Sequence, residues 1–270
     1  MTDPKDGAAA RGTVDPAELP EHLRGYFAEL DRYDVEATIA HFSPDCLYAV
    51  PGVARWRPGM VDAGPRAAVR GREALAGRFS DRGRMNHFHE FSALAGTGDR
   101  WILEGIGRDG DTGETTVTFC SSVTLDEEGL VRRYLAFFAA PPLPPVPARI
   151  ELGPGVSAGA ALRGLYEARA RGDADAVAAA LAPEAVLALP RAAGEDSELL
   201  LARAEELGDR VPGFRDDTSY DPGLVFERGS HALFEGQIAG PDGTVLASAA
   251  VDAAGRIVRL AEFVCVPEAP

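Results

Sequence analysis

The stretch LRGYFAELDRYDVEATIAHFSPDCLYAVP at Leu23–Pro51 returns without a gap as LRGLYEARARGDADAVAAALAPEAVLALP at Leu162–Pro190. Ten of the 29 aligned positions are identical. The later segments GLVRRYLAFF, which begins at Gly129, and GRIVRLAEFV, which begins at Gly255, also match. A repeat of this length predicts two copies of one structural unit.

The limits of the copies follow from the repeat and from proline content. We expect a mobile tail over residues 1–18, a first domain over 19–140, a linker over 141–155 and a second domain over 156–270. The linker region reads AAPPLPPVPARIELGPG from Ala139, and its prolines predict an extended, semi-rigid strap rather than a helix.

The composition is that of a folded, acidic protein. Hydrophobic residues make up 46% of the 270 residues, and the formal net charge is −15. Nucleic-acid binding needs clustered cations, so no nucleic-acid partner is expected. The sequence has no apolar run of about 18 residues and no signal-peptide core at its N-terminus, so we expect a cytoplasmic protein without a membrane partner.

Each copy places its helices before its strands. In the first copy, Pro20–Phe42 has helical apolar spacing, and Asp34 is expected to cap a second helix over Val35–Phe42. The remaining expected elements are a turn at Ser43–Asp45, a short strand at Leu47–Val50, a helix at Gly71–Phe79, strands at Met85–Leu94, Arg100–Ile106, Thr115–Leu125 and Val131–Phe138, and, in the second copy, a helix at Ser197–Leu207. This order predicts an α+β fold with a curved, mostly antiparallel sheet wrapped on the N-terminal helices.

The order of elements, with the motif D-x-x-x-h-h-x-h-F/L-x-P-D/E and the GREAL helix, resembles the NTF2-like superfamily. Within it, SnoaL-like polyketide cyclases and ketosteroid isomerases are the most similar groups. The resemblance covers residues 20–140 and 156–266. It implies two cone-shaped α+β barrels, each with a pocket between the concave sheet and the helices. The gapless repeat and the proline-rich strap predict a monomer whose two copies pack as a pseudo-dimer. The resemblance implies that the sheet backs meet, to which outward-facing Leu135 and Phe137 are suited.

The positions of the isomerase catalytic groups are informative. The resemblance places the helix-borne oxyanion tyrosine at Tyr26, the base aspartate at Val50 and the second oxyanion acid near Ser121. Two of the three groups are therefore replaced, and any chemistry must use other side chains. The corresponding positions of the second copy are Leu165, Leu189 and about Ala247, so the first copy is expected to carry any activity.

Strand alternation predicts which side chains line the first pocket. The expected catalytic residues are His87, His89, Glu104 and Tyr26. The expected substrate-binding residues are Tyr48, Val50, Trp56, Phe119, Ser121, Tyr134 and Phe138. A histidine titrates near neutral pH and can act as a general base, a buried glutamate can orient it or be the base itself, and a tyrosine can donate to an enolate oxygen.

Structural interpretations of the same residues stay open. The histidines can face solvent or pack in the core, the tyrosines can be core aromatics, and Trp56 can lie in a solvated loop. Glu104 and its copy Glu235 recur in both halves, which favours a structural role. A His-x-His pair with a carboxylate also suggests a metal, but no known metal motif is present. Neither a metal nor a cofactor is expected, and Cys46, Cys120 and Cys265 fit no disulfide framework.

The leading functional hypothesis is a cofactor-independent acid/base enzyme of specialised metabolism. It would cyclise, isomerise or dehydrate an apolar polyketide-like or terpenoid-like small molecule. One alternative is an epoxide hydrolase/cyclase of the polyether type, whose tandem layout is similar, although Val50 and Leu189 occupy its acidic positions. The other alternative is a non-catalytic small-molecule-binding or scaffold protein.

Overall fold

The structure is a computed structural model that describes residues 13–50, 53–55, 67–82, 86–140, 142–190, 199–203, 220–238 and 243–265. Its first half begins with the 3-10 turn η1 (Pro16–Glu18). The elements that follow are α1 (Glu21–Arg32), α2 (Val35–Ala40), β1 (Phe42–Val50), β2 (Val53–Arg55), β3 (Ala67–Arg70), α3 (Arg72–Arg82), β4 (His87–Thr97), β5 (Arg100–Asp109), β6 (Thr115–Leu125) and β7 (Val131–Ala140).

The second half repeats this order. Its elements are α4 (Ala158–Ala170), α5 (Ala174–Ala180), β8 (Leu181–Pro190), β9 (Leu199–Arg203), β10 (Tyr220–Arg228), β11 (His231–Ile238), β12 (Gly243–Val251) and β13 (Ile257–Cys265). The same device starts the second helix of each half. Asp34 accepts a hydrogen bond from the backbone N–H of Ala37 at 2.9 Å, and Asp173 accepts one from Ala176 at 3.0 Å. The expected cap at Asp34 is confirmed.

The two sheets have one topology. In the described residues the strand orders are β3-β1-β7-β6-β5-β4 and β10-β11-β12-β13-β8-β9, with β2 joined to β7. Each sheet is antiparallel except where its first long strand pairs with its last, and where β2 runs parallel to β7. The expected α+β class is therefore confirmed, and each half has the helices-then-curved-sheet arrangement of the NTF2-like fold.

Two expected elements are wrong. Ser43–Asp45 is not a turn but part of β1, and the pairing of β1 with β7 shifts register between Phe42 and Leu47. The segment expected as a helix at Ser197–Leu207 instead contains β9, which pairs antiparallel with β8. A short leucine run has no decisive periodicity, so pairing with a neighbouring strand determines its structure.

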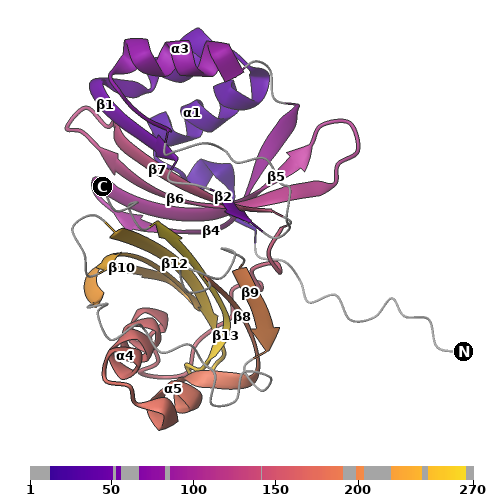
Figure 1. Ribbon diagram of the computed structural model, residues 1–270, viewed down its shortest axis with the longest axis vertical. Helices are drawn as coiled ribbons and strands as arrows, with labels where there is room; N and C mark the ends of the chain where they lie inside the picture. Colours follow the sequence, from indigo (N-terminus) through magenta and orange to yellow (C-terminus); the bar gives the residue numbers. More distant parts are fainter. Residues whose placement is uncertain are drawn as a thin grey trace, which may run out of the picture.

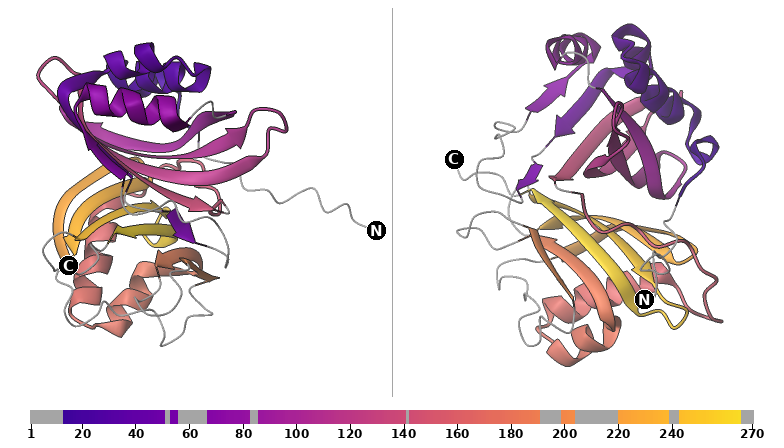
Figure 2. Two further views of the ribbon diagram at one scale, coloured as in Figure 1. Left: turned by 45° about the horizontal axis from the view of Figure 1, so that its top comes forward. Right: turned by 90° about the vertical axis from the view of Figure 1, so that its right-hand side faces the viewer.

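The two halves pack sheet to sheet. Figure 1 shows α1 and α3 on one outer side, α4 and α5 on the other, and the backs of the two sheets meeting between them. The turned views of Figure 2 show the same layers. A buried apolar cluster joins Leu135, Phe137 and Cys120 of the first sheet to Leu246 and Phe263 of the second. The outward direction expected for Leu135 and Phe137, and the pseudo-dimer packing, are confirmed.

Two equivalent ion pairs cross this interface. Glu104 accepts from both terminal nitrogens of Arg259, at 2.5 and 3.0 Å, and Glu235 lies 2.8 Å from Nη2 of Arg133. The repeat aligns Arg133 with Arg259 and Glu104 with Glu235. Each half therefore gives an arginine to the other and receives one, as in an interface with a two-fold axis.

The strap between the halves is bonded to both sheets. The backbone N–H of Leu143 donates to Thr118 at 2.9 Å in the first half. In the second half, the carbonyls of Pro144 and Pro147 accept from Arg259 and His231, each at 2.8 Å. This segment is consequently docked along its length rather than suspended between the domains.

Candidate functional site

The interior of the first domain lies between α1, α3 and the concave face of its sheet. Its apolar wall is a buried cluster of aromatic and aliphatic side chains. This cluster includes Tyr26, Phe27, Tyr48, Phe91, Phe119 and Tyr134. Polar side chains enter this wall at two places, one next to the end of α1 and one at the side of the sheet formed by β1 and β7.

The first polar group is a pair formed by His89 on β4 and Asp31 in the last turn of α1. Nδ1 of His89 lies 2.5 Å from one carboxylate oxygen of Asp31, and the backbone N–H of His89 donates to the other at 3.1 Å. The His89 side chain is 8% exposed. An ionised carboxylate only accepts hydrogen bonds, so Nδ1 of His89 carries a proton, and in the neutral form of the ring the lone pair is on Nε2. Asp31 thus fixes both the tautomer and the position of the ring.

His87 lies beside this pair. Its ring centroid is 4.7 Å from that of His89, and the rings are tilted by 67°. Burial, the neighbouring His89 and the Arg82 guanidinium lower the pKa of His87 to about 4. His87 is therefore neutral at pH 7 and is a weaker base than an ordinary imidazole. The expected inward direction of both histidines is confirmed.

The second polar group consists of three buried tyrosines. The Tyr48 and Tyr134 rings are stacked with centroids 5.3 Å apart, and the Tyr26 ring is 5.2 Å from that of Tyr134. Ser121 Oγ donates to the Tyr134 hydroxyl at 3.0 Å. Burial is the main cause that raises the pKa of each of the three phenols. All three remain protonated at neutral pH and are hydrogen-bond donors.

Phe119 lies between the two polar groups. Its ring centroid is 5.3 Å from that of His89 and 6.0 Å from that of Phe27, which in turn contacts Tyr26. Phe138 contacts Phe119 at 6.5 Å, and Val50 packs on the edge of the same cluster. These expected residues do face one interior. Trp56 lies outside the described residues.

Glu104 does not belong to this site, and the expectation that it faces the first pocket is wrong. It lies on the back of the sheet, 1% exposed, in the ion pair with Arg259. The residues of β5 that face the interior are Leu103, Gly105 and Gly107, which pair with Ser121, Phe119 and Val117 of β6. A one-residue error in parity reverses the faces of a strand. The structural interpretation of Glu104 and Glu235 is the correct one.

Two residues of the site were not found from the sequence. Asp31 follows Leu30 near the end of α1 and precedes Arg32. The sequence suggests a charged residue exposed to solvent at this position, but in the structure Asp31 orients His89. Arg82, at the end of α3, acts electrostatically on His87, Tyr26 and Tyr48. Neither has a motif. The only available signal for Asp31 is its place one helical turn after Phe27, whose ring contacts His89 at 5.1 Å.

The interior of the second domain is built differently. Nη1 of Arg169 on α4 lies 2.5 Å from Glu262 on β13, and their side chains are 5% and 1% exposed. The repeat aligns these residues with Leu30 and Ala136 of the first domain. Glu235 does not belong to this interior and lies in the interface between the sheets.

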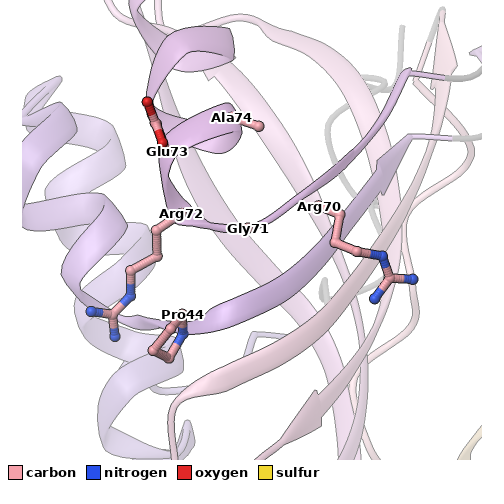
Figure 3. A pocket seen from close by; sticks show the side chains of 6 residues that line it. All are labelled: Pro44, Arg70, Gly71, Arg72, Glu73 and Ala74. Atoms are coloured by element: carbon pink, nitrogen blue, oxygen red, sulfur yellow. The ribbon is translucent and has the colours of Figure 1, made fainter.

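A surface hollow of about 580 Å³ lies at the start of α3. Arg70 and Arg72 line it, but Figure 3 shows their side chains pointing away from each other. Arg72 Nε donates to the carbonyl of Phe42 instead. The two cations therefore do not converge on one ligand position, and the hollow is separate from the histidine group.

Comparison with known proteins gives structural matches only. Neither a family model nor a curated protein sequence matches the chain. A Sinorhizobium meliloti protein proposed to be a polyketide cyclase is 18% identical, with a TM-score of 0.34, covering 46% of this chain and 99% of its own. A Burkholderia thailandensis SnoaL-like protein of unknown function is 18% identical, with a TM-score of 0.35 and coverages of 47% and 99%.

A third match is an NTF-2 like protein of unknown function from Burkholderia xenovorans. It is 20% identical, with a TM-score of 0.35, and the match covers 46% of this chain and 85% of that one. No helix in the described part of the chain is long and apolar enough to cross a bilayer.

Proposed function

We propose that the first domain is a cofactor-independent acid/base catalyst that acts on an apolar, carbonyl-containing small molecule. The observation that carries this proposal is the contact of 2.5 Å between His89 and Asp31 in an aromatic interior. A histidine whose tautomer is fixed by a carboxylate has the arrangement of a general base. The reaction class would be isomerisation, cyclisation or dehydration through an enolate, as the SnoaL-like resemblance implies.

Each polar group has a part in the proposed reaction. Nε2 of His89 would take a proton from the carbon next to the carbonyl, and Asp31 would stabilise the imidazolium that forms. The negative charge would then develop on the carbonyl oxygen, where Tyr26 or Tyr134 could donate a hydrogen bond. Return of the proton to another carbon gives isomerisation. Cleavage of a β C–O bond, with the hydroxyl leaving as water after it takes the proton held by His89, gives dehydration.

The expected substrate is apolar because of the wall around these groups. Phe27, Phe91 and Phe119 contact one another, and Phe27 and Phe119 also contact His89. Aromatic faces bind flat apolar rings by dispersion and burial of apolar surface. His89 and Asp31 pair with each other, and their charges cancel when the ring is protonated. The pair therefore offers no free counter-ion to a charged group of a ligand.

The test is proton exchange, because it needs neither a cofactor nor knowledge of the final product. The full chain is incubated in D2O with β-tetralone, cyclohexenone and an apolar 1,3-diketone, and loss of the α-proton signal is followed by NMR. We expect exchange above the buffer rate for at least one compound. His89→Ala should return it to the buffer rate, and Asp31→Asn should reduce it. Exchange that is unchanged in both variants would contradict the proposal.

A second candidate, a binding module without turnover, is favoured by one observation. The three tyrosines and Ser121 contact one another, as they would in a closed core. The same compounds distinguish the two functions. A binding protein would show saturable heats by calorimetry with each ligand that it accepts, and no exchange of the α-proton.

A further inference from the structure

Two histidines outside the proposed active site face each other at the outer end of the first domain. His22 lies in the first turn of α1, and His41 follows the last residue of α2. Their Nδ1 atoms are 3.3 Å apart, and the ring centroids are 5.5 Å apart with a tilt of 58°. Both side chains are half-buried, and the acid/base chemistry proposed above does not use them.

Both rings lie against the backbone at a glycine residue. A Cβ atom added to Gly25 would overlap the ring of His41, so this ring rests on the backbone of α1. A Cβ atom added to Gly129 would come within 3.6 Å of the His22 ring, so this ring covers the turn between β6 and β7. The pair consequently lies where three elements meet: α1, the end of α2, and the β6–β7 turn.

The distance between the two Nδ1 atoms distinguishes a hydrogen bond between the rings from shared coordination of a metal ion. Hydrogen bonds with an N–H donor have modal lengths of about 2.9–3.0 Å, so 3.3 Å is long for a bond between the rings. Two nitrogens bound to one tetrahedral Zn²⁺ at about 2.05 Å each are about 3.3–3.4 Å apart. We propose that Nδ1 of His22 and Nδ1 of His41 together bind a divalent transition-metal ion, with water in the remaining positions.

The surroundings suit a cation of this class. Glu29 and Glu21 act electrostatically on His41 in the sense that favours a positive charge, against the larger effects of burial and of His22, and Asp126 interacts electrostatically with His22. Neutral imidazole is a ligand that suits Zn²⁺, Cu²⁺ and Ni²⁺ rather than Mg²⁺ or Ca²⁺. Within the described ranges no group of three or more His, Cys, Asp or Glu side chains could hold a metal, so this is a two-residue site. Its affinity should be correspondingly modest.

The second domain gives an internal comparison. The repeat aligns His22 with Ala161 and His41 with Ala180. The glycine that matches Gly25 is Gly164, and nothing lies within 4 Å of a Cβ atom added there. The close approach at Gly25 therefore accompanies the histidine and is not a requirement of the fold.

The experiment is calorimetric titration of the full chain with ZnCl2 at pH 7.5, repeated with CuCl2. We expect one Zn²⁺ per chain, and a dissociation constant that rises at least about tenfold in His41→Ala and in His22→Ala. His87→Ala is the matched control, because it removes one member of the other histidine pair and should leave this binding unchanged. Circular dichroism establishes that each variant is folded.

A second measurement follows the unmodified chain, and the variants serve only to assign its resonances. Zn²⁺ should shift the ¹⁵N resonances of the Nδ1 atoms of two histidines, which the His22→Ala and His41→Ala spectra assign. Unchanged affinity in His41→Ala, shifts that belong to His87 and His89, or no saturable binding would each overturn the proposal. The last result would leave a long hydrogen bond as the role of the pair.

Discussion

The interior of the first domain holds a histidine–aspartate pair between β4 and the end of α1, whereas that of the second holds an arginine–glutamate pair between α4 and β13. The arginine–glutamate pair is buried and the histidine–aspartate pair is partly buried, in two interiors built on the same strand topology. A histidine–aspartate pair can gain and lose a proton near neutral pH, and an arginine cannot be deprotonated in a protein. The difference separates an interior suited to proton transfer from one suited to a fixed charge.

The fixed pair in the second domain is not explained by stability. A buried ion pair is often no more stabilising than apolar residues of the same volume, because both charges lose their hydration. The first domain has apolar residues at these positions, Leu30 and Ala136. The same fold thus accommodates either an ion pair or apolar residues at these two positions. The polar groups of each interior therefore indicate the function of that domain better than the fold does.

The largest expected effect tests which interior carries the activity. His89→Ala should lower the rate of the exchange reaction by about 10²–10⁴-fold, or about 3–5 kcal/mol in the barrier, because it removes the proposed base. Glu262→Gln, the control in the second domain, should leave the rate per folded molecule unchanged. Loss of activity in Glu262→Gln with full activity in His89→Ala would assign the chemistry to the second domain.

The next effect compares the two ion pairs of the interface. Arg259→Met leaves Glu104 buried without its counter-ion, and should reduce the free energy of unfolding by about 3–5 kcal/mol. Arg133→Met should cost about 1 kcal/mol, because the Arg133 side chain is 30% exposed and water can solvate Glu235. Urea denaturation measures both.

The control for this comparison is the double variant Arg259→Met with Glu104→Leu. It removes both buried charges, so most of the lost stability should return. Equal costs for Arg259→Met and Arg133→Met would show that the two pairs do not differ as their exposures indicate.

A smaller effect concerns the pH dependence of the first domain. The pKa of His87 is lowered from an ordinary value of 6.5 to about 4, so the unfolded chain binds more protons than the folded one between these values. Stability is therefore full above pH 6.5 and falls as the pH drops towards 4. With allowance for solvent near a partly exposed ring, the loss should be about 1–2 kcal/mol. Urea denaturation at pH 4 and 7 measures it, and His87→Phe should reduce the difference.

The smallest effect tests where the two domains are alike. Asp34→Ala and Asp173→Ala each remove one equivalent helix cap, and each should cost about 1 kcal/mol. The cost should be similar in both domains, because the two capping bonds measure 2.9 and 3.0 Å. Thermal unfolding followed by circular dichroism checks this. Costs that differ severalfold would mean that the halves do not share their local energetics.

Local patterns were sufficient for most of the fold. Neighbouring residues are sufficient to predict the cap at Asp34 and the strand Thr115–Leu125, and both are present in the structure. The repeat is visible when the two segments of the sequence are aligned. The faces of β5 could not be predicted in this way. The pairing of Phe91 with Gly105 carries the inward face of β4 across to β5, and the bulge between Phe91 and Ala93 moves the inward face of β4 to Leu94.

The site was predictable only in its strand-borne part. His87, His89, Ser121 and Tyr134 follow from alternation along strands whose faces were assigned correctly. Asp31 could not be predicted, because its contact with His89 depends on how α1 crosses the end of β4, which no local pattern encodes. The monomeric state stays a prediction.

The docked strap changes the concentration dependence of the whole assembly. Two separate chains that met through such an interface would dissociate on dilution. Here the partner is always present at the effective concentration set by the connection between β7 and α4, which for short connections is in the millimolar range. Because Leu143, Pro144 and Pro147 are themselves bonded to the sheets, the connection also selects one mutual orientation. Folding of one half therefore supplies the other with a surface that dilution does not remove.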